Sequence, residues 1–207
     1  INLSRIGEAE STLSNIRETL HTIASNDRDT LLFAMQDKVA EALGYQDADA
    51  LMLEVSKSAR LVDFAMKRAW EYYKQPKPSR FKKIKTENVG KGLIAQRNEL
   101  LFEESYPIDQ DPGLGIRAAA IAAQRGLKLS AIAIHQLAEN LTQLPKPWPR
   151  STREDFVAFI GAGRDMVEVF EALDQEGLIS KWIPEWEHVR FLPQRNALHR
   201  HTVDRHM

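Results

Sequence analysis

The feature that most constrains the fold is a long run of apolar residues at helical spacing in the first third of the chain. After Asp47, apolar side chains recur at alternating intervals of three and four residues: Met52, Val55, Ala59, Val62, Met66, Ala69 and Tyr73. This spacing predicts one long helix that begins near Asp47. Two interpretations fit, a coiled-coil seam and a bundle helix that buries one face. The bundle helix is favoured, because Ala and Tyr are poor seam residues.

Glycine residues mark where two further helices are expected to end. Gly44 follows an apolar periodic segment, and Gly126 follows the alanine-rich segment 116–125. A glycine just past the last turn is the commonest helix stop, since it adopts a left-handed backbone without strain. Ser130 is placed to cap the next helix, expected over 131–141.

The composition changes near residue 76. Between Lys74 and Lys91 seven residues are basic and one is acidic, whereas the whole chain has a net charge of −1. This local excess fits either a surface that attracts phosphate or nucleic acid, or a solvated linker, and the linker is favoured. The balanced overall charge argues against a dedicated nucleic-acid-binding protein. The segments 89–95 and 99–103 then predict a β-hairpin that turns at 96–98.

These patterns predict a mainly α protein, a helical bundle in two parts joined by a small β-hairpin segment. The expected regions are an N-terminal helical region over residues 1–75, a basic linker with the hairpin over 76–110, a second helical region over 111–190 and a C-terminal region over 191–207. Hydrophobic residues form 43% of the chain, enough for a packed core. No apolar run approaches the ~20 residues of a membrane span, and the lack of cysteine suits a reducing compartment such as the cytoplasm. The chain begins at Ile1 rather than Met, so we expect a processed chain or a piece of a longer one.

Short motifs with chemical meaning are few. No glycine-rich loop that could cradle a nucleotide phosphate is complete in this sequence. Two pairs of carboxylates, Asp47 with Asp49 and Asp109 with Asp111, have the spacing of metal ligands. The plainer interpretation is that the first pair begins a helix, where acids favour the dipole, and the second lies in a turn.

Histidine is concentrated at the C-terminus. Four of the six histidines lie in the last twenty residues: His188, His199, His201 and His206. Histidine is the commonest metal ligand and a common acid–base group. Two interpretations stay open, a histidine-rich surface tail and one half of a metal site.

The same C-terminal stretch carries a resemblance to a known family. The runs 184–190, 193–196 and 199–206, with 171–179 upstream, resemble the PII uridylyltransferase/uridylyl-removing family. The runs around 111–120 and 20–45 resemble its central helical region more loosely. The matching segment enters that family's HD-type phosphohydrolase domain, so the resemblance implies that 191–207 is the entry to a truncated HD domain.

The resemblance implies a nitrogen-regulating enzyme in which one domain attaches uridylyl to the PII protein and the HD domain removes it. This chain lacks the transferase motifs, the His-Asp dipeptide and the later metal aspartate. We therefore expect a central fragment that links the two domains, with no catalytic residue and no cofactor of its own. His206 matches the family's first HD metal ligand, in an incomplete site. Mg²⁺ or another divalent metal is implied for the parent protein.

The implied partners are PII and the adjoining transferase and HD domains, with no membrane and no nucleic acid, in the cytoplasm. The isolated fragment is expected to be inactive, and the sequence does not decide between uridylyl and adenylyl transfer. Two other classes stay open. One is the related helical region of a glutamine-synthetase adenylyltransferase, disfavoured by the HD entry at 202–206. The other is a stand-alone helical interaction module that binds through a basic patch, the seven basic residues from Lys74 to Lys91.

Overall fold

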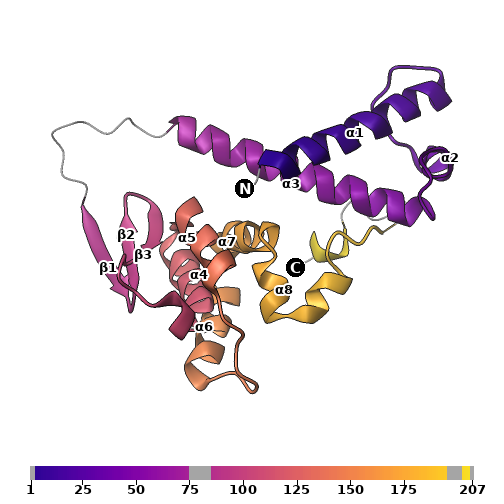
Figure 1. Ribbon diagram of the computed structural model, residues 1–207. Helices are drawn as coiled ribbons and strands as arrows, with labels where there is room; N and C mark the ends of the chain where they lie inside the picture. Colours follow the sequence, from indigo (N-terminus) through magenta and orange to yellow (C-terminus); the bar gives the residue numbers. More distant parts are fainter. Residues whose placement is uncertain (1–2, 75–84, 195–201, 206–207) are drawn as a thin grey trace. The chain divides into compact units, whose positions relative to one another are not determined.

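A computed structural model gives the structure of the chain, and it describes residues 3–74, 85–194 and 202–205. Internal contacts divide the chain into two compact units. Unit 1 comprises Ile1–Pro76 and Glu185–Met207, and unit 2 comprises Lys77–Pro184. The described residues contain eight α-helices and one four-stranded sheet (Figure 1). The prediction of a mainly α protein with a small β segment is confirmed.

Unit 1 is built on three helices, α1 (Leu3–Ala24), α2 (Phe33–Leu43) and α3 (Ala48–Lys74). The two long helices α1 and α3 lie side by side in antiparallel directions, and α2 packs against both (Figure 1). A long helix after Asp47 was predicted and is confirmed. Its packing against α1 and α2 agrees with the bundle interpretation.

The face that α3 buries differs from the predicted one. Its buried residues are Ala48, Leu51, Ser58, Leu61 and Phe64, whereas every residue of the predicted stripe is half-buried or exposed. Met66 is 66% exposed and Tyr73 79% exposed. The reason is tertiary packing: the buried face is the one that meets α1 and α2, and the spacing along one helix does not determine which face that is.

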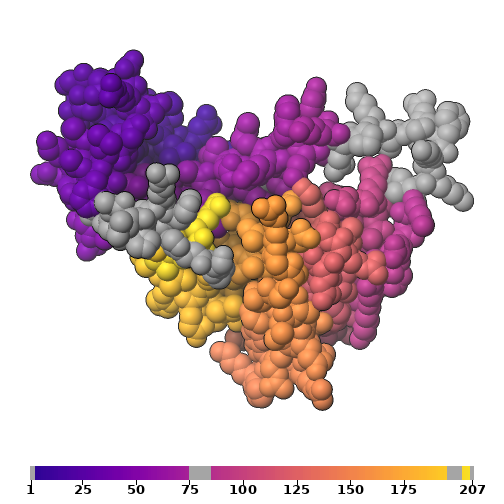
Figure 2. Space-filling view, turned by 180° about the vertical axis from the view of Figure 1, so that it is seen from behind, coloured from indigo at the N-terminus to yellow at the C-terminus, as the bar shows by residue number. Residues whose placement is uncertain are grey.

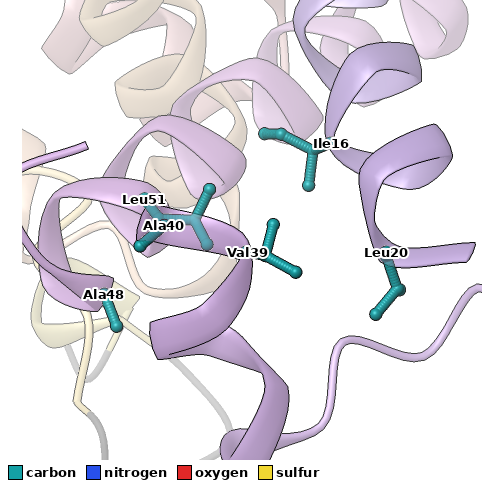
Figure 3. Packing of buried hydrophobic residues seen from close by; sticks show 6 residues of the cluster. All are labelled: Ile16, Leu20, Val39, Ala40, Ala48 and Leu51. Atoms are coloured by element: carbon teal, nitrogen blue, oxygen red, sulfur yellow. The ribbon is translucent and has the colours of Figure 1, made fainter. Parts of the chain in front are cut away.

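The core of unit 1 joins its three helices. Six buried side chains form it, two from each helix: Ile16, Leu20, Val39, Ala40, Ala48 and Leu51 (Figure 3). The chain can turn from α2 into α3 beside this core because Gly44 takes a left-handed conformation with φ 76°. The predicted glycine stop at Gly44 is therefore confirmed.

Unit 2 begins with three short antiparallel strands, β1 (Thr86–Gly90), β2 (Leu93–Gln96) and β3 (Glu99–Phe102). The prediction of one strand over 89–95 was wrong, since a turn at Lys91 and Gly92 splits it. A fourth strand, β4 (Lys128–Leu129), pairs parallel to β3, so the hairpin is part of a four-stranded sheet. Arg97 begins the β2–β3 turn in the left-handed region, at φ 59°.

The helices of unit 2 pack around α4 (Leu114–Arg125), in which eight of twelve residues are buried. Five of these are alanines, whose small side chains let α6 (Arg150–Ile160) and α7 (Arg164–Gln175) pack against it. Ala131–Asn140 forms α5 and Leu178–Trp182 forms α8. In the space-filling view the magenta strands and the pink-to-orange helices form one continuous body (Figure 2).

Two predicted boundaries in unit 2 are confirmed. Gly126 ends α4 in a left-handed conformation with φ 61°. The Ser130 hydroxyl accepts a hydrogen bond from the Ala133 amide at 3.0 Å, so it caps α5. None of the helices in the described ranges has the length and apolar character needed to cross a membrane.

Candidate functional site

The C-terminal segment that carries the family resemblance returns to helix α3 within unit 1. Its described portion ends in a short 3-10 helix, η3 (Val203–Arg205). The Val203 amide donates a hydrogen bond to the Leu192 carbonyl at 2.9 Å. The Arg60 guanidinium, on α3, forms an ion pair with the carboxylate of Asp204. These two contacts fix residues 202–205 to the rest of unit 1.

The Arg60–Asp204 pair is shielded from water. The Asp204 side chain is fully buried and the Arg60 side chain is 11% exposed. One carboxylate oxygen of Asp204, Oδ2, accepts from Arg60, whereas Oδ1 is buried and has no hydrogen-bond partner in the described portion of the chain. A buried carboxylate is stable only when paired, so Arg60 is what allows Asp204 to lie inside the unit.

An aromatic ring completes this arrangement. The guanidinium groups of Arg60 and Arg190 each lie 4.6 Å from the centre of the buried Phe191 ring, a cation–π geometry. Phe191 itself has φ 59°, in the left-handed region that bulky residues rarely adopt. We call Arg60, Arg190, Phe191 and Asp204 the C-terminal anchor.

His206, the predicted metal ligand, lies outside the described residues, two positions after Asp204. His199 and His201 also lie outside them, and His188 ends the 3-10 helix η2 (Pro184–His188). Within residues 3–74, 85–194 and 202–205 no group of three or more His, Asp or Glu side chains could hold a metal ion. The metal role of His206 therefore stays a prediction.

The two carboxylate pairs with metal-like spacing have structural partners. Asp47 Oδ1 accepts a hydrogen bond from the Ala50 amide at 2.7 Å, at the start of α3. Asp111 Oδ2 lies 2.6 Å from Arg117 Nη2. The plainer interpretation of both motifs, a helix start and a turn, agrees with these contacts.

Asp111 belongs to a polar cluster that the sequence did not predict. Tyr106 donates to Asp111 Oδ2 at 2.6 Å, and Arg117 also donates to the carbonyl of Lys91 at 3.1 Å. Burial raises the pKa of Asp111, but the hydrogen bonds from Arg117 and Tyr106 outweigh it and leave that pKa below its ordinary value. Because Arg117 joins the β1–β2 turn to helix α4, this cluster ties the sheet to the helices of unit 2.

A second carboxyl beside this cluster responds in the opposite direction. Burial raises the pKa of Asp155, on α6, and the nearby Arg117 charge does not offset this. Sequence periodicity could not have revealed the polar cluster around Asp111 or the raised pKa of Asp155. The groups involved come together only in the folded unit.

Comparison with known proteins finds relatives that share one name. The protein-family model described as GlnD PII-uridylyltransferase matches residues 2–68 of the chain. The chain is 38% identical to the bifunctional uridylyltransferase/uridylyl-removing enzyme of Streptomyces coelicolor, over 98% of the chain and 26% of that protein. It is 32% identical to the enzyme of the same name from Mycobacterium tuberculosis, over 96% of the chain and 25% of that protein. No solved structure matches.

A third relative of the same name, from Corynebacterium glutamicum, is 28% identical over 99% of the chain and 30% of its own length. Nearly the whole chain is thus similar to one region of the bifunctional uridylyltransferase/uridylyl-removing enzymes. It spans about a quarter of the length of the curated relatives it matches.

Proposed function

We propose that this chain is the central helical connector of a PII-modifying enzyme, placed between a domain that transfers a uridylyl group to PII and an HD domain that removes it. The observation that carries this proposal is the C-terminal anchor. The segment that resembles the entry to the HD domain ends, in its described portion, on a buried ion pair with helix α3. An entry segment held this way transmits the position of the helical unit to the domain after it.

The alignment supports the same role. Relatives named for both activities align with nearly the whole chain, while the chain covers about a quarter of their length. About three quarters of each relative lies outside the aligned region, which leaves room for separate transferase and hydrolase domains on either side of a connector. The partners would be PII and the two adjoining domains, in the cytoplasm, which the lack of cysteine suits.

Divalent metal, Mg²⁺ or another ion, would serve the parent protein and not this region alone. Two-metal and single-metal hydrolytic sites need several converging ligands. In this chain His206 would supply one ligand, and the described residues add no group that completes the set. We propose that the remaining ligands come from the HD domain.

The experiment compares this chain with a longer protein that contains it. Each is incubated with PII and UTP, and separately with uridylylated PII, and the mass of PII is followed by mass spectrometry. We expect transfer and removal by the longer protein and neither by the 207-residue chain. Modification of PII by the chain itself would show that the region is catalytic, and no reaction by the longer protein would refute the proposal.

The stand-alone interaction module remains the second candidate, because the described portion of the basic patch includes exposed Lys85 and Lys91. A pull-down of PII or another acidic protein by the isolated chain, lost when these lysines are neutralised, would favour it over the connector.

A further inference from the structure

We propose that Arg60 is a positioning residue for the uridylyl-removing reaction. Through its ion pair with Asp204, it fixes the direction in which the chain leaves the helical unit toward His206. Arg60 lies on helix α3, 146 positions before His206 in the sequence, and nothing in its local pattern marks it. The inference rests on the proposed function, since it assumes that the HD domain comes after this segment.

Three described contacts hold the segment at different points. Arg60 binds the Asp204 carboxylate, and the same guanidinium stacks on the Phe191 ring at 4.6 Å. The Val203 amide binds the Leu192 carbonyl at 2.9 Å. Arg60 therefore contacts the chain both before and after the stretch 195–201, at Phe191 and at Asp204.

The C-terminal anchor restricts the orientation of the chain at Asp204 and does more than stabilise the fold. A buried ion pair loses so much solvation that an apolar pair of similar volume often holds a fold equally well. Here the cost is increased, because Asp204 Oδ1 is buried without a partner among the described residues and Phe191 has a left-handed backbone. A guanidinium and a carboxylate accept few relative orientations, whereas apolar side chains slide past each other.

Direction matters because the candidate metal ligand comes so soon after the anchor. Ligands of a metal site must be held to within about 0.5 Å of their working positions by residues outside the site. His206 is only two positions beyond Asp204 in the sequence, so a movement of Asp204 would move the candidate ligand by a similar distance. Asp204 Oδ1, which has no partner among the described residues, is an acceptor of the kind that orients metal-bound histidine in many proteins.

The first experiment uses the chain itself and needs no metal. Hydrogen exchange at the Val203 amide reports whether the segment is held. Arg60→Met should speed this exchange by about 10–150-fold, the factor that corresponds to a hydrogen bond to a charged group. Arg60→Lys keeps a cation for Asp204 and should speed the exchange less than Arg60→Met does. Lys67→Met is the matched control on the same helix, because Lys67 pairs with Asp63 in an exposed ion pair at 2.6 Å. Unchanged exchange in Arg60→Met would refute the anchoring.

The second experiment separates positioning from stability. The double variant Arg60→Met/Asp204→Leu replaces the ion pair by an apolar contact and should unfold at nearly the same urea concentration as the wild-type chain. In a longer protein that contains the HD domain, it should still lower kcat for uridylyl removal by about tenfold or more. The KM for modified PII and the rate of uridylyl transfer should stay unchanged, because only the ligand geometry is altered.

The outcomes distinguish this inference from the proposed function. Wild-type kcat for removal in a stably folded double variant would refute the positioning role of Arg60. Absence of removal activity in the unmutated longer protein would refute the proposed function instead. Recovery of kcat toward the wild-type value by Arg60→Lys, relative to Arg60→Met, would support a role of the cation in orientation.

Discussion

Replacing Arg117 by Met is the most direct test of how unit 2 is held together. Arg117 lies in the first turn of α4, and its Nη2 atom donates to Asp111 Oδ2 at 2.6 Å and to the Lys91 carbonyl at 3.1 Å. Methionine keeps the apolar stem, which packs much as the arginine stem does, and removes the guanidinium. The substitution therefore tests the polar contacts and not the packing.

The expected loss follows from burial. The side chains of Arg117 and Asp111 are 20% and 19% exposed. Hydrogen bonds to a charged group are worth about 1.5–3 kcal/mol net, and the removal of one member of a fully buried pair costs about 3–5 kcal/mol. Because some water reaches this pair and the Lys91 contact is exposed, we expect the free energy of unfolding of unit 2 to fall by about 2–3 kcal/mol.

The assay is urea unfolding followed by circular dichroism, with hydrogen exchange of peptides from residues 85–129 to assign the change to unit 2. Arg125→Met is the matched control: Arg125 lies on the same helix and pairs with Glu87 at 2.8 Å, and their side chains are 47% and 56% exposed. Exposed pairs contribute about 0–1 kcal/mol. If Arg117→Met costs no more than Arg125→Met, the argument from burial is wrong.

Four further predictions concern charge and the C-terminus. The pKa of Asp111 lies below its ordinary 3.8, so the Asp111 carboxylate stabilises the fold above that pH, and this stabilisation is lost as pH falls through the folded-state pKa. Acid unfolding, followed by circular dichroism, should therefore become less steep in Asp111→Asn. The pKa of Asp155 is raised, so its carboxylate costs stability at neutral pH, and Asp155→Asn should raise the urea midpoint at about pH 7 but not at about pH 3. A pH-independent effect would contradict either assignment. Neutralising Lys82, Lys83 and Lys85, of which the first two lie outside the described residues, should change the free energy of unfolding by only about ±0.5 kcal/mol in urea titrations. A loss of several kcal/mol would contradict a solvated linker. The isolated chain should show no tight divalent-metal binding by calorimetry, with or without His206→Ala, and stoichiometric binding lost in that variant would overturn the incomplete site.

The parts of the fold that the sequence predicted are those decided locally. Gly44 and Gly126 end their helices because a left-handed residue is needed there, whatever packs nearby. The Ser130 cap depends on an amide three residues away. Such signals are complete within one turn of helix, so reading them needs no knowledge of the tertiary structure.

The parts that the sequence did not predict are decided by contacts between distant residues. Spacing alone could not choose between two adjacent faces of α3, because the choice depends on which face meets α1 and α2. The turn at Lys91 and Gly92 was hidden in a run that is otherwise typical of a strand. The parallel pairing of β3 with β4 brings Leu100 opposite Leu129, a register that no local pattern encodes.

For the same reason, the sequence revealed only part of the candidate site. The family resemblance rests on consecutive residues, so it pointed to His206, but it could not show what holds the segment before it. Asp204 is buried, and a buried carboxylate requires a paired cation. The adjacent Arg205 is exposed on the same short 3-10 helix, and the cation that pairs with Asp204 comes from helix α3. Its partner Arg60 is 144 positions away. A change in helix α3 is thereby felt at Asp204. In the connector proposed above, such a change would act on a reaction to which this region contributes no catalytic group.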